Sequence, residues 1–490
     1  MRLLRFGALI AIAAACGPRH GATSAPTLPP EATEFPALRF VPDKPTYILT
    51  AKTVRDAQRG WKDTIESFGM VVGVTTSEVS RELEQVLAVD PLSVEGAAKL
   101  GVDPDGGLAM FSEATDPTFV VHLAAPEAAQ AFFDHLRDTG LRTQSVIVDG
   151  TEINTAVVVG NVSVSWSIDK DWLWAHFAFG LDKDPAHTWF THARHPAGTA
   201  WRASFGWATK IGAAKSPIVG FFDSHALIAP LFGKAPHQLL ACAARFDTIR
   251  RVGFTIEGDG HHVGGRIALD LGPAAHAIAA ALRPPPAGFD AVAAPAPLAV
   301  QWNLDLGTVA EWLQPCAAGL RLDLELTRYG VRTGRIAIQT LDPDDKSGTG
   351  VVAFDLLSKQ YFSKLLDEVP RRSMFESERT YGTFAGHRLK IPFIVTLDYV
   401  LDDHVALAGM GDGLLDKLVM GAAPQTAPIV QIDVAPTKLS PEAWQYLIGL
   451  MTNERYAKAV TEHLVRWHDG HIAASIDRET LVIEASGNRR

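Results

Sequence analysis

Three histidines lie close together in the sequence and are its best candidate for chemistry. They are His187, His192 and His195, with Asp184 shortly before them. Imidazole is the commonest zinc ligand, and a catalytic zinc site uses three protein ligands and leaves one position open. Residues 191–196 are typical of a loop, however, and no carboxylate can be assigned behind the imidazoles. Because the chain has 17 histidines, one such cluster is expected by chance. We favour solvated loop histidines, and a metal-dependent hydrolase remains the alternative.

Other polar groups give weaker signals for catalysis. His261-His262 adjoins a predicted hairpin turn, and the pairs Asp344-Asp345 and Asp402-Asp403 lie in predicted turns. Aspartate in a turn usually bonds to the local backbone. The sequence contains no Gly-x-Ser-x-Gly elbow, phosphate loop, dinucleotide fingerprint or His-Glu-x-x-His pair. We therefore predict no catalytic residue and no cofactor.

Tryptophan is concentrated in one stretch of the chain. Six of the 11 tryptophans lie within residues 166–207, and the strand predicted over 172–179 is apolar on both faces. An antiparallel strand with one solvated face should alternate instead. Either a second layer covers this strand and the rings are core, or the rings line a cleft that suits a ligand or partner. The core interpretation is favoured. The ligand-binding hypothesis concerns Trp166, Trp172, Trp174, Trp189, Trp201 and Trp207.

The N-terminal stretch predicts where the protein works. A positively charged start leads into an apolar run over residues 6–12, and Ala13-Ala14-Ala15 precedes Cys16. This layout is typical of a secretory signal peptide. A cysteine directly after small residues resembles the lipobox of bacterial lipoproteins. The resemblance implies that residues 1–15 are removed and that Cys16 is lipidated at the new N-terminus. Cleavage after the small residues without lipidation is the alternative.

Composition and charge fit an exported globular protein. The chain has 490 residues, of which 47% are hydrophobic and 20% charged, enough for two to four domains. No later apolar run approaches the roughly 18 residues of a membrane span, so we expect attachment through lipid. Removal of two arginines leaves 43 basic and 55 acidic residues, a net charge of −12, which argues against nucleic acid. An oxidising compartment suggests a disulfide between Cys242 and Cys316, with two separate buried thiols as the alternative.

Two parts of the chain repeat one order of predicted elements. In the first, a buried strand at 119–123 precedes a helix that Pro126 opens. In the second, a strand at 351–354 precedes a helix that Ser358 caps. An alternating hairpin follows each helix. The repeat is one of pattern, because few residues are identical. We predict an α+β fold of two pattern-related halves, each an antiparallel sheet with helices packed on one face.

The boundaries of these parts follow from composition. Prolines without apolar periodicity are typical of a tether before residue 38, and Pro284-Pro285-Pro286 begins an Ala/Pro-rich run between the halves. We therefore expect a signal peptide at 1–15, a lipidated cysteine and tether at 16–37, a first half at 38–283, a joint at 284–296 and a second half at 297–490.

Together these features resemble the lipoproteins of Gram-negative envelopes. The resemblance covers residues 1–16 and the general layout, and it assigns no catalytic residue. We predict a non-catalytic lipoprotein of the cell envelope, held in the outer membrane through Cys16, on its periplasmic face or at the surface. We expect it to bind a protein partner or an apolar or glycan ligand through the Trp-rich region of the first half.

Overall fold

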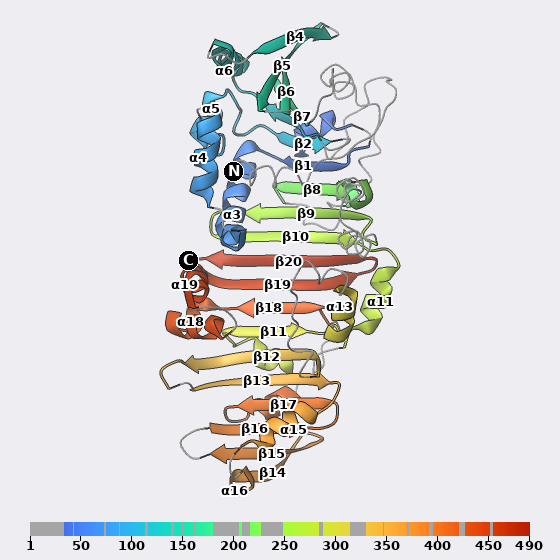
Figure 1. Ribbon diagram of the computed structural model, residues 1–490, viewed down its shortest axis with the longest axis vertical. Helices are drawn as coiled ribbons and strands as arrows, with labels where there is room; N and C mark the ends of the chain where they lie inside the picture. The colour runs from blue at the N-terminus through green and yellow to red at the C-terminus, as the bar shows by residue number, and fades with distance from the viewer. Residues whose placement is uncertain are drawn as a thin grey trace. The chain divides into compact units, whose positions relative to one another are not determined.

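The computed structural model describes most of the chain from Glu34 to Arg490 and separates it into two compact units. Unit 1 comprises Met1–Pro236 and Ile249–Asp270, and unit 2 comprises His237–Thr248 and Leu271–Arg490. Figure 1 labels the described helices and strands. The structure describes residues 34–490 except 43, 73–74, 88, 113–115, 139–141, 149, 160–161, 180–204, 208–215, 227–247, 284–287, 314–329, 346, 370–371, 392–394, 421–426 and 451–453.

The described strands of unit 1 pair throughout in antiparallel fashion. Their order across the sheet is β4-β5-β6-β7-β3-β2-β1-β8-β9-β10. The bounds are β1 (Tyr47–Ala51), β2 (Leu108–Ser112), β3 (Thr118–His122), β4 (Thr143–Val148), β5 (Thr151–Val159), β6 (Val162–Asp169), β7 (Trp172–Phe179), β8 (Ile218–Asp223), β9 (Arg251–Gly258) and β10 (His262–Asp270). The turn predicted at Gly258-Asp259-Gly260 joins β9 to β10, and Gly260 adopts a φ of 90°, which favours glycine.

The α-helices of unit 1 that pack on its sheet lie on one face. Phe133 of α6 stacks on Trp166 of β6, and α3 packs against β1, β8 and β9. The opposite face is covered by a short 3-10 helix, η2, whose Ala37 and Leu38 are fully buried. The bounds are η2 (Pro36–Phe40), α3 (Val54–Val72), α4 (Thr76–Leu87), α5 (Val94–Lys99) and α6 (Pro126–Asp138).

Unit 2 is also built on antiparallel strands. Its strands pair in the order β14-β15-β16-β17-β13-β12-β11-β18-β19-β20. The bounds are β11 (Leu298–Trp302), β12 (Val331–Asp342), β13 (Ser347–Leu356), β14 (Glu376–Tyr381), β15 (Phe384–Ile391), β16 (Val395–Leu401), β17 (Val405–Met410), β18 (Val430–Val434), β19 (Trp467–Asp477) and β20 (Thr480–Arg489). The α+β class is confirmed.

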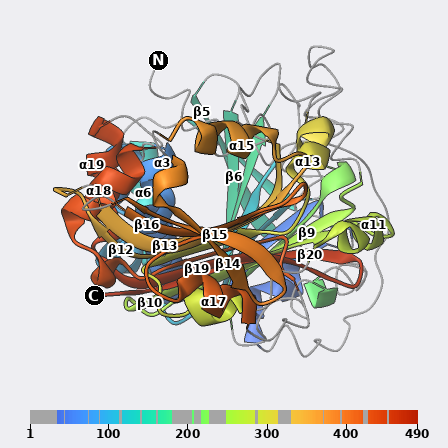
Figure 2. The ribbon, with the colours of Figure 1, turned by 90° about the horizontal axis from the view of Figure 1, so that it is seen from below.

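Helices cover both faces of the unit 2 sheet, so the prediction of helices on one face is wrong there. Phe362 of α15 packs on Phe354 of β13. Leu415 of α17 is fully buried with Ala353, the neighbour of Phe354 that points to the other face. Figure 2 shows α15 and α17 on opposite sides of these strands. The bounds are α11 (Ala274–Ala281), α12 (Phe289–Ala293), α13 (Leu306–Leu313), α15 (Gln360–Asp367), α16 (Arg372–Phe375), α17 (Leu414–Met420), η4 (Pro436–Lys438), α18 (Pro441–Gly449) and α19 (Glu454–Leu464).

The segment expected to be a joint belongs to the core of unit 2. Within residues 288–296, α12 buries Phe289 to 2% and Val292 to 1% exposure, and both pack in the cluster that contains Leu415. The units divide between Asp270 and Leu271, before Pro284. The prolines therefore precede α12, a helix that packs into the core of unit 2. None of the described helices is long and apolar enough to cross a membrane.

Candidate binding groove

The described tryptophans of the Trp-rich stretch are core residues. Trp166, Trp172 and Trp174 are exposed by only 2%, 4% and 2%. Trp172 and Trp174 each meet the ring of Phe40 edge to face, at centroid distances of 4.8 and 4.6 Å. A ring that is out of water cannot form a contact surface, so the cleft interpretation is wrong for these three. Trp207 is partly buried against the same cluster, under the guanidinium of Arg251.

The remaining predicted sites lie outside the described residues. They are the lipidation site Cys16, the cysteines Cys242 and Cys316, the histidines His187, His192 and His195, and the tryptophans Trp189 and Trp201. In the part of the chain that is described, no group of three or more His, Cys, Asp or Glu side chains could hold a metal ion.

A histidine in unit 1 joins two carboxylates but serves as a structural link. His122 contacts Asp103 through Nδ1 at 2.9 Å and Asp171 through Nε2 at 3.1 Å, and its ring packs edge to face on Trp172. Gly106 has no room for a side chain, because a Cβ there would lie 2.6 Å from the Cβ of His122. Both imidazole nitrogens contact carboxylates, so His122 links the segment that holds Asp103 to the turn that holds Asp171.

A second polar cluster lies inside unit 2. The Arg388 guanidinium donates two hydrogen bonds to Asp398, at 2.5 and 2.6 Å, and the Tyr381 hydroxyl donates a third at 2.6 Å. Burial alone would raise the pKa of Asp398, but these donors hold it below its ordinary value. Burial and the bond to Asp398 raise the pKa of Tyr381 to about 12. Asp398 is only 1% exposed, so the cluster joins β14, β15 and β16 rather than meeting a ligand.

The best candidate site is formed by α18 and α19 on the surface of unit 2. Helix α18 begins where Ser440 Oγ accepts a hydrogen bond from the Ala443 N–H at 3.1 Å, with Pro441 in the first turn. Ala443 and Trp444 form its inner face and are 0% and 2% exposed. The Trp444 indole N–H donates to the Pro436 carbonyl at 3.0 Å. Burial of this inner face holds α18 against unit 2, so residues on the other faces of the helix are accessible to solvent.

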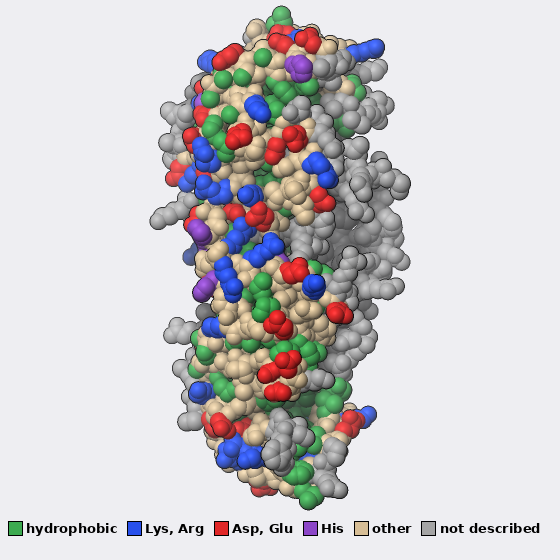
Figure 3. All heavy atoms as spheres, turned by 90° about the vertical axis from the view of Figure 1, so that its left-hand side faces the viewer, with side chains coloured by type: hydrophobic (Ala, Val, Ile, Leu, Met, Phe, Trp, Pro, Cys, Tyr) green, Lys and Arg blue, Asp and Glu red, His purple; other side chains and the backbone are tan. Residues whose placement is uncertain are grey.

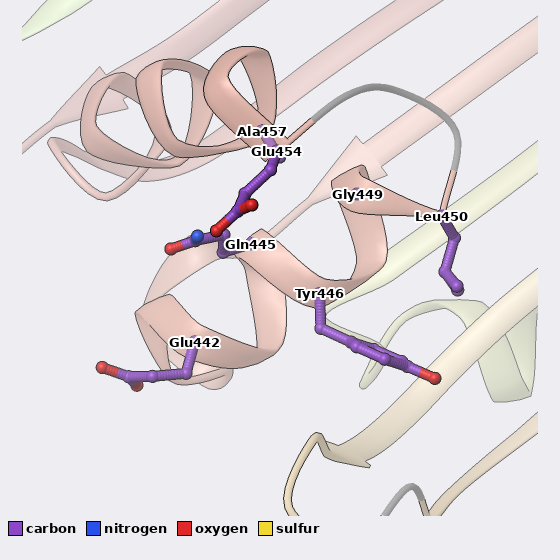
Figure 4. Close-up of a pocket in the computed structure, with 7 residues that line it drawn as sticks. All are labelled: Glu442, Gln445, Tyr446, Gly449, Leu450, Glu454 and Ala457. Atoms are coloured by element: carbon purple, nitrogen blue, oxygen red, sulfur yellow. The ribbon is translucent and has the colours of Figure 1, made fainter.

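A groove of about 530 Å³ lies between these helices (Figure 4). At its base, a Cβ added to Gly449 would lie 3.9 Å from the Cβ of Ala457, which is ordinary van der Waals contact. The groove size is within the range of small-molecule and peptide side-chain pockets. It is lined by Glu442, Gln445, Tyr446, Gly449, Leu450, Glu454 and Ala457.

The groove combines apolar surface with negative charge. Leu450 is 67% exposed, so its aliphatic side chain is available to a ligand. Glu442 and Glu454 are exposed, and the described residues that line the groove include no Lys or Arg. Gln445 and Glu454 point toward each other across the space between the helices, whereas Tyr446 and Leu450 project from another side of α18 (Figure 4). Figure 3 shows acidic and hydrophobic side chains next to one another on the face that includes these helices.

Sequence reasoning missed this groove, although one signal was available. The stretch from Ser440 to Leu450 begins with a capping serine and a proline, which marks a helix start. It then has apolar residues on two faces, with Trp444 on one and Tyr446 and Leu450 on the other. A helix with two apolar faces that ends near the surface is a candidate for a partner site.

Comparison with known proteins gives little for this chain. No family model matches its sequence, and no curated protein matches it. Among solved structures, crystal form III of TP0453 aligns at 10% identity over 51% of this chain and 87% of that chain, with a TM-score of 0.29. Crystal form IV of TP0453 aligns at 9% identity over 50% of this chain and 84% of that chain, with a TM-score of 0.28.

Proposed function

We propose that the protein is a non-catalytic lipoprotein of the cell envelope that binds a polypeptide partner through the groove between α18 and α19. The proposal is carried by a groove that is lined by the exposed Leu450 and by the carboxylates of Glu442 and Glu454. The sequence suggested a site in the first half; because Trp166, Trp172 and Trp174 are buried there, we propose a site in unit 2 instead. The envelope location rests on the signal-peptide pattern and on Cys16.

The chemistry of the groove favours a cationic, amphipathic segment. An apolar side chain of the partner would cover Leu450 and the ring of Tyr446, with a favourable free energy from removing their surface from water. Lysine or arginine on the same segment would face Glu442 and Glu454 and would increase the association rate. A helix with an apolar face that is flanked by basic residues has this arrangement.

A pair of model peptides tests the groove. The probe is a short helical peptide of leucine and lysine with a fluorescent label, and its partner has glutamate in place of lysine. We expect the lysine peptide alone to bind the full chain. Leu450→Asp and the double variant Glu442→Lys/Glu454→Lys should each weaken its binding at least about tenfold, about 1.4 kcal/mol.

The matched control is Glu462→Lys, an exposed residue of α19 that does not line the groove. It changes the net charge in the same direction as the double variant and should leave binding within about twofold, since distant surface charges are screened by salt. Equal binding of both peptides, or equal weakening by Glu462→Lys, would reject the groove as a specific site.

The lipid anchor is a separate proposal with its own test. Cys16→Ala should move the protein from the membrane fraction to the soluble fraction, and the wild-type N-terminal peptide should carry an acyl mass. Unchanged membrane association without acylation would refute it. The hydrolase alternative built on His187, His192 and His195 predicts bound metal in the purified protein, and elemental analysis measures this directly.

We further propose that the two units are repeats of one ten-strand design, as the sequence pattern predicted. The order of pairings supports this. Each strand of unit 1 has the same neighbours as the strand of unit 2 whose label is ten higher, from β4 and β14 at one end to β10 and β20 at the other. Separate expression of residues 271–490, the continuous part of unit 2 that holds its ten strands, tests whether this part folds alone, as a repeat with its own core should.

A further inference from the structure

Strand β4 is an edge of unit 1 with unusual side chains. Among the described residues it pairs with β5 alone, so one side of its backbone has no strand beside it. Four of its six residues are exposed, from Gln144 to Ile147. Val146 is 47% exposed and Ile147 75%. Because successive residues point to opposite faces, apolar surface is present on both faces of the edge.

The corresponding edge of unit 2 provides a comparison within the same chain. Strand β14 pairs only with β15 among the described residues, and its four central residues are also exposed. Those residues are Ser377, Glu378, Arg379 and Thr380, so the edge carries both signs of charge. Charged side chains are a common protection of sheet edges against pairing with other chains. Strand β4 has no charge and no proline, so it lacks that protection.

The residues of β4 favour strand addition. Its sequence, Thr143 to Val148, has four β-branched residues in six and none that disfavours a strand by charge or ring closure. On the side of β4 that pairs with β5, Val146 lies opposite Ile153, which is 1% exposed and fixes the register of the two strands. The edge is therefore a pre-formed template, and an incoming strand would find its donors and acceptors already positioned.

We propose that an extended, uncharged segment of a partner polypeptide adds to the sheet of unit 1 alongside β4. Main-chain hydrogen bonds would supply affinity, and the side chains of Val146 and Ile147 would select apolar, β-branched neighbours on each face. A second copy of this chain is less suitable as the occupant. Stable interfaces between folded chains use about 20–30 residues a side, whereas this edge has six. The surface is in unit 1, so this proposal is independent of the α18–α19 groove.

A labelled threonine–valine peptide is the probe, with a photoreactive benzophenone at one end. Its control has the same composition except for a central proline, which cannot pair in a ladder. We expect the first peptide to bind the full chain, and its photoadduct to map to residues 143–148. Ile147→Lys should weaken binding at least about tenfold. Ile147→Thr keeps a β-branched, uncharged side chain and should change binding less than about threefold.

Thr380→Lys on β14 is the matched variant for the other edge and should have no effect on binding. The proposal is overturned if neither peptide binds, if both bind equally, or if the photoadduct maps outside β4. It is also overturned if sedimentation shows a dimer that Ile147→Lys dissociates, because the occupant would then be a second copy. Circular dichroism of each variant separates loss of binding from loss of folding.

Discussion

Replacing Trp174 with alanine should destabilise unit 1 by about 3–5 kcal/mol. The side chain is 2% exposed and lies in the cluster that contains Phe40, Phe111 and Phe205. Truncation removes most of its contacts and leaves a cavity under η2. The ring pair with Phe40, at 4.6 Å, would also be lost. An edge-to-face pair of this kind contributes about 0.5–1.5 kcal/mol beyond burial.

The assay should report on unit 1 alone, because a chain with two units need not unfold in one step. Hydrogen exchange of peptides that cover β3 and β7 measures the opening free energy of this core. Each 1.4 kcal/mol corresponds to a tenfold faster exchange, so Trp174→Ala should accelerate it at least about a hundredfold. Trp61→Ala is the control, because Trp61 is 41% exposed on α3. Exchange rates within error of that control would show that Trp174 is no core residue and would refute our assignment.

Three further predictions concern charge and covalent structure. Burial lowers the pKa of His176 to about 4, so unfolding takes up a proton below about pH 6.5. The free energy of unfolding should therefore be about 2 kcal/mol lower at pH 5 than at pH 7. Urea titrations at the two pH values measure this loss, and His176→Asn should abolish it. Asp398→Asn should cost about 3 kcal/mol because it leaves Arg388 without its counter-ion in a buried site, whereas Asp403→Asn, in the exposed pair with Lys359, should leave the unfolding midpoint unchanged. Non-reducing peptide mapping should recover Cys242 and Cys316 as one linked pair, and two free thiols would contradict the predicted disulfide.

The sequence predicted elements best where one period dominates. Strands were expected at residues 119–123 and 351–354. Residues 119–122 lie in β3, and residues 351–354 lie within β13. The helix expected after Pro126 is α6, and the turn at Gly258-Asp259-Gly260 joins β9 to β10. In each case the local pattern and the tertiary environment agree, because period and turn chemistry alone decide the outcome.

The sequence failed where burial depends on a distant element. The run after Pro284 was interpreted as a joint, yet Phe289 and Val292, three residues apart, anchor α12 in the core of unit 2. A five-residue helix is too short for periodicity to reveal it. The two apolar faces of β7 were noticed, and the favoured core interpretation holds for Trp172 and Trp174. The residue that covers them, Phe40, is more than a hundred residues earlier and could not be identified from the local pattern. Local pattern cannot distinguish a covered face from a cleft.

If the two units repeat one design, their differences are where function should be sought, because a shared sheet order is scaffold and sites are added to it. The edges provide the clearest contrast. Exposed positions of β14 carry Glu378 and Arg379, whereas those of β4 carry Val146 and Ile147. Selection against aggregation alone would protect both edges equally. The absence of charge on β4, in a chain whose β14 edge is charged, is therefore better explained by a partner that covers β4 than by weak selection on that edge.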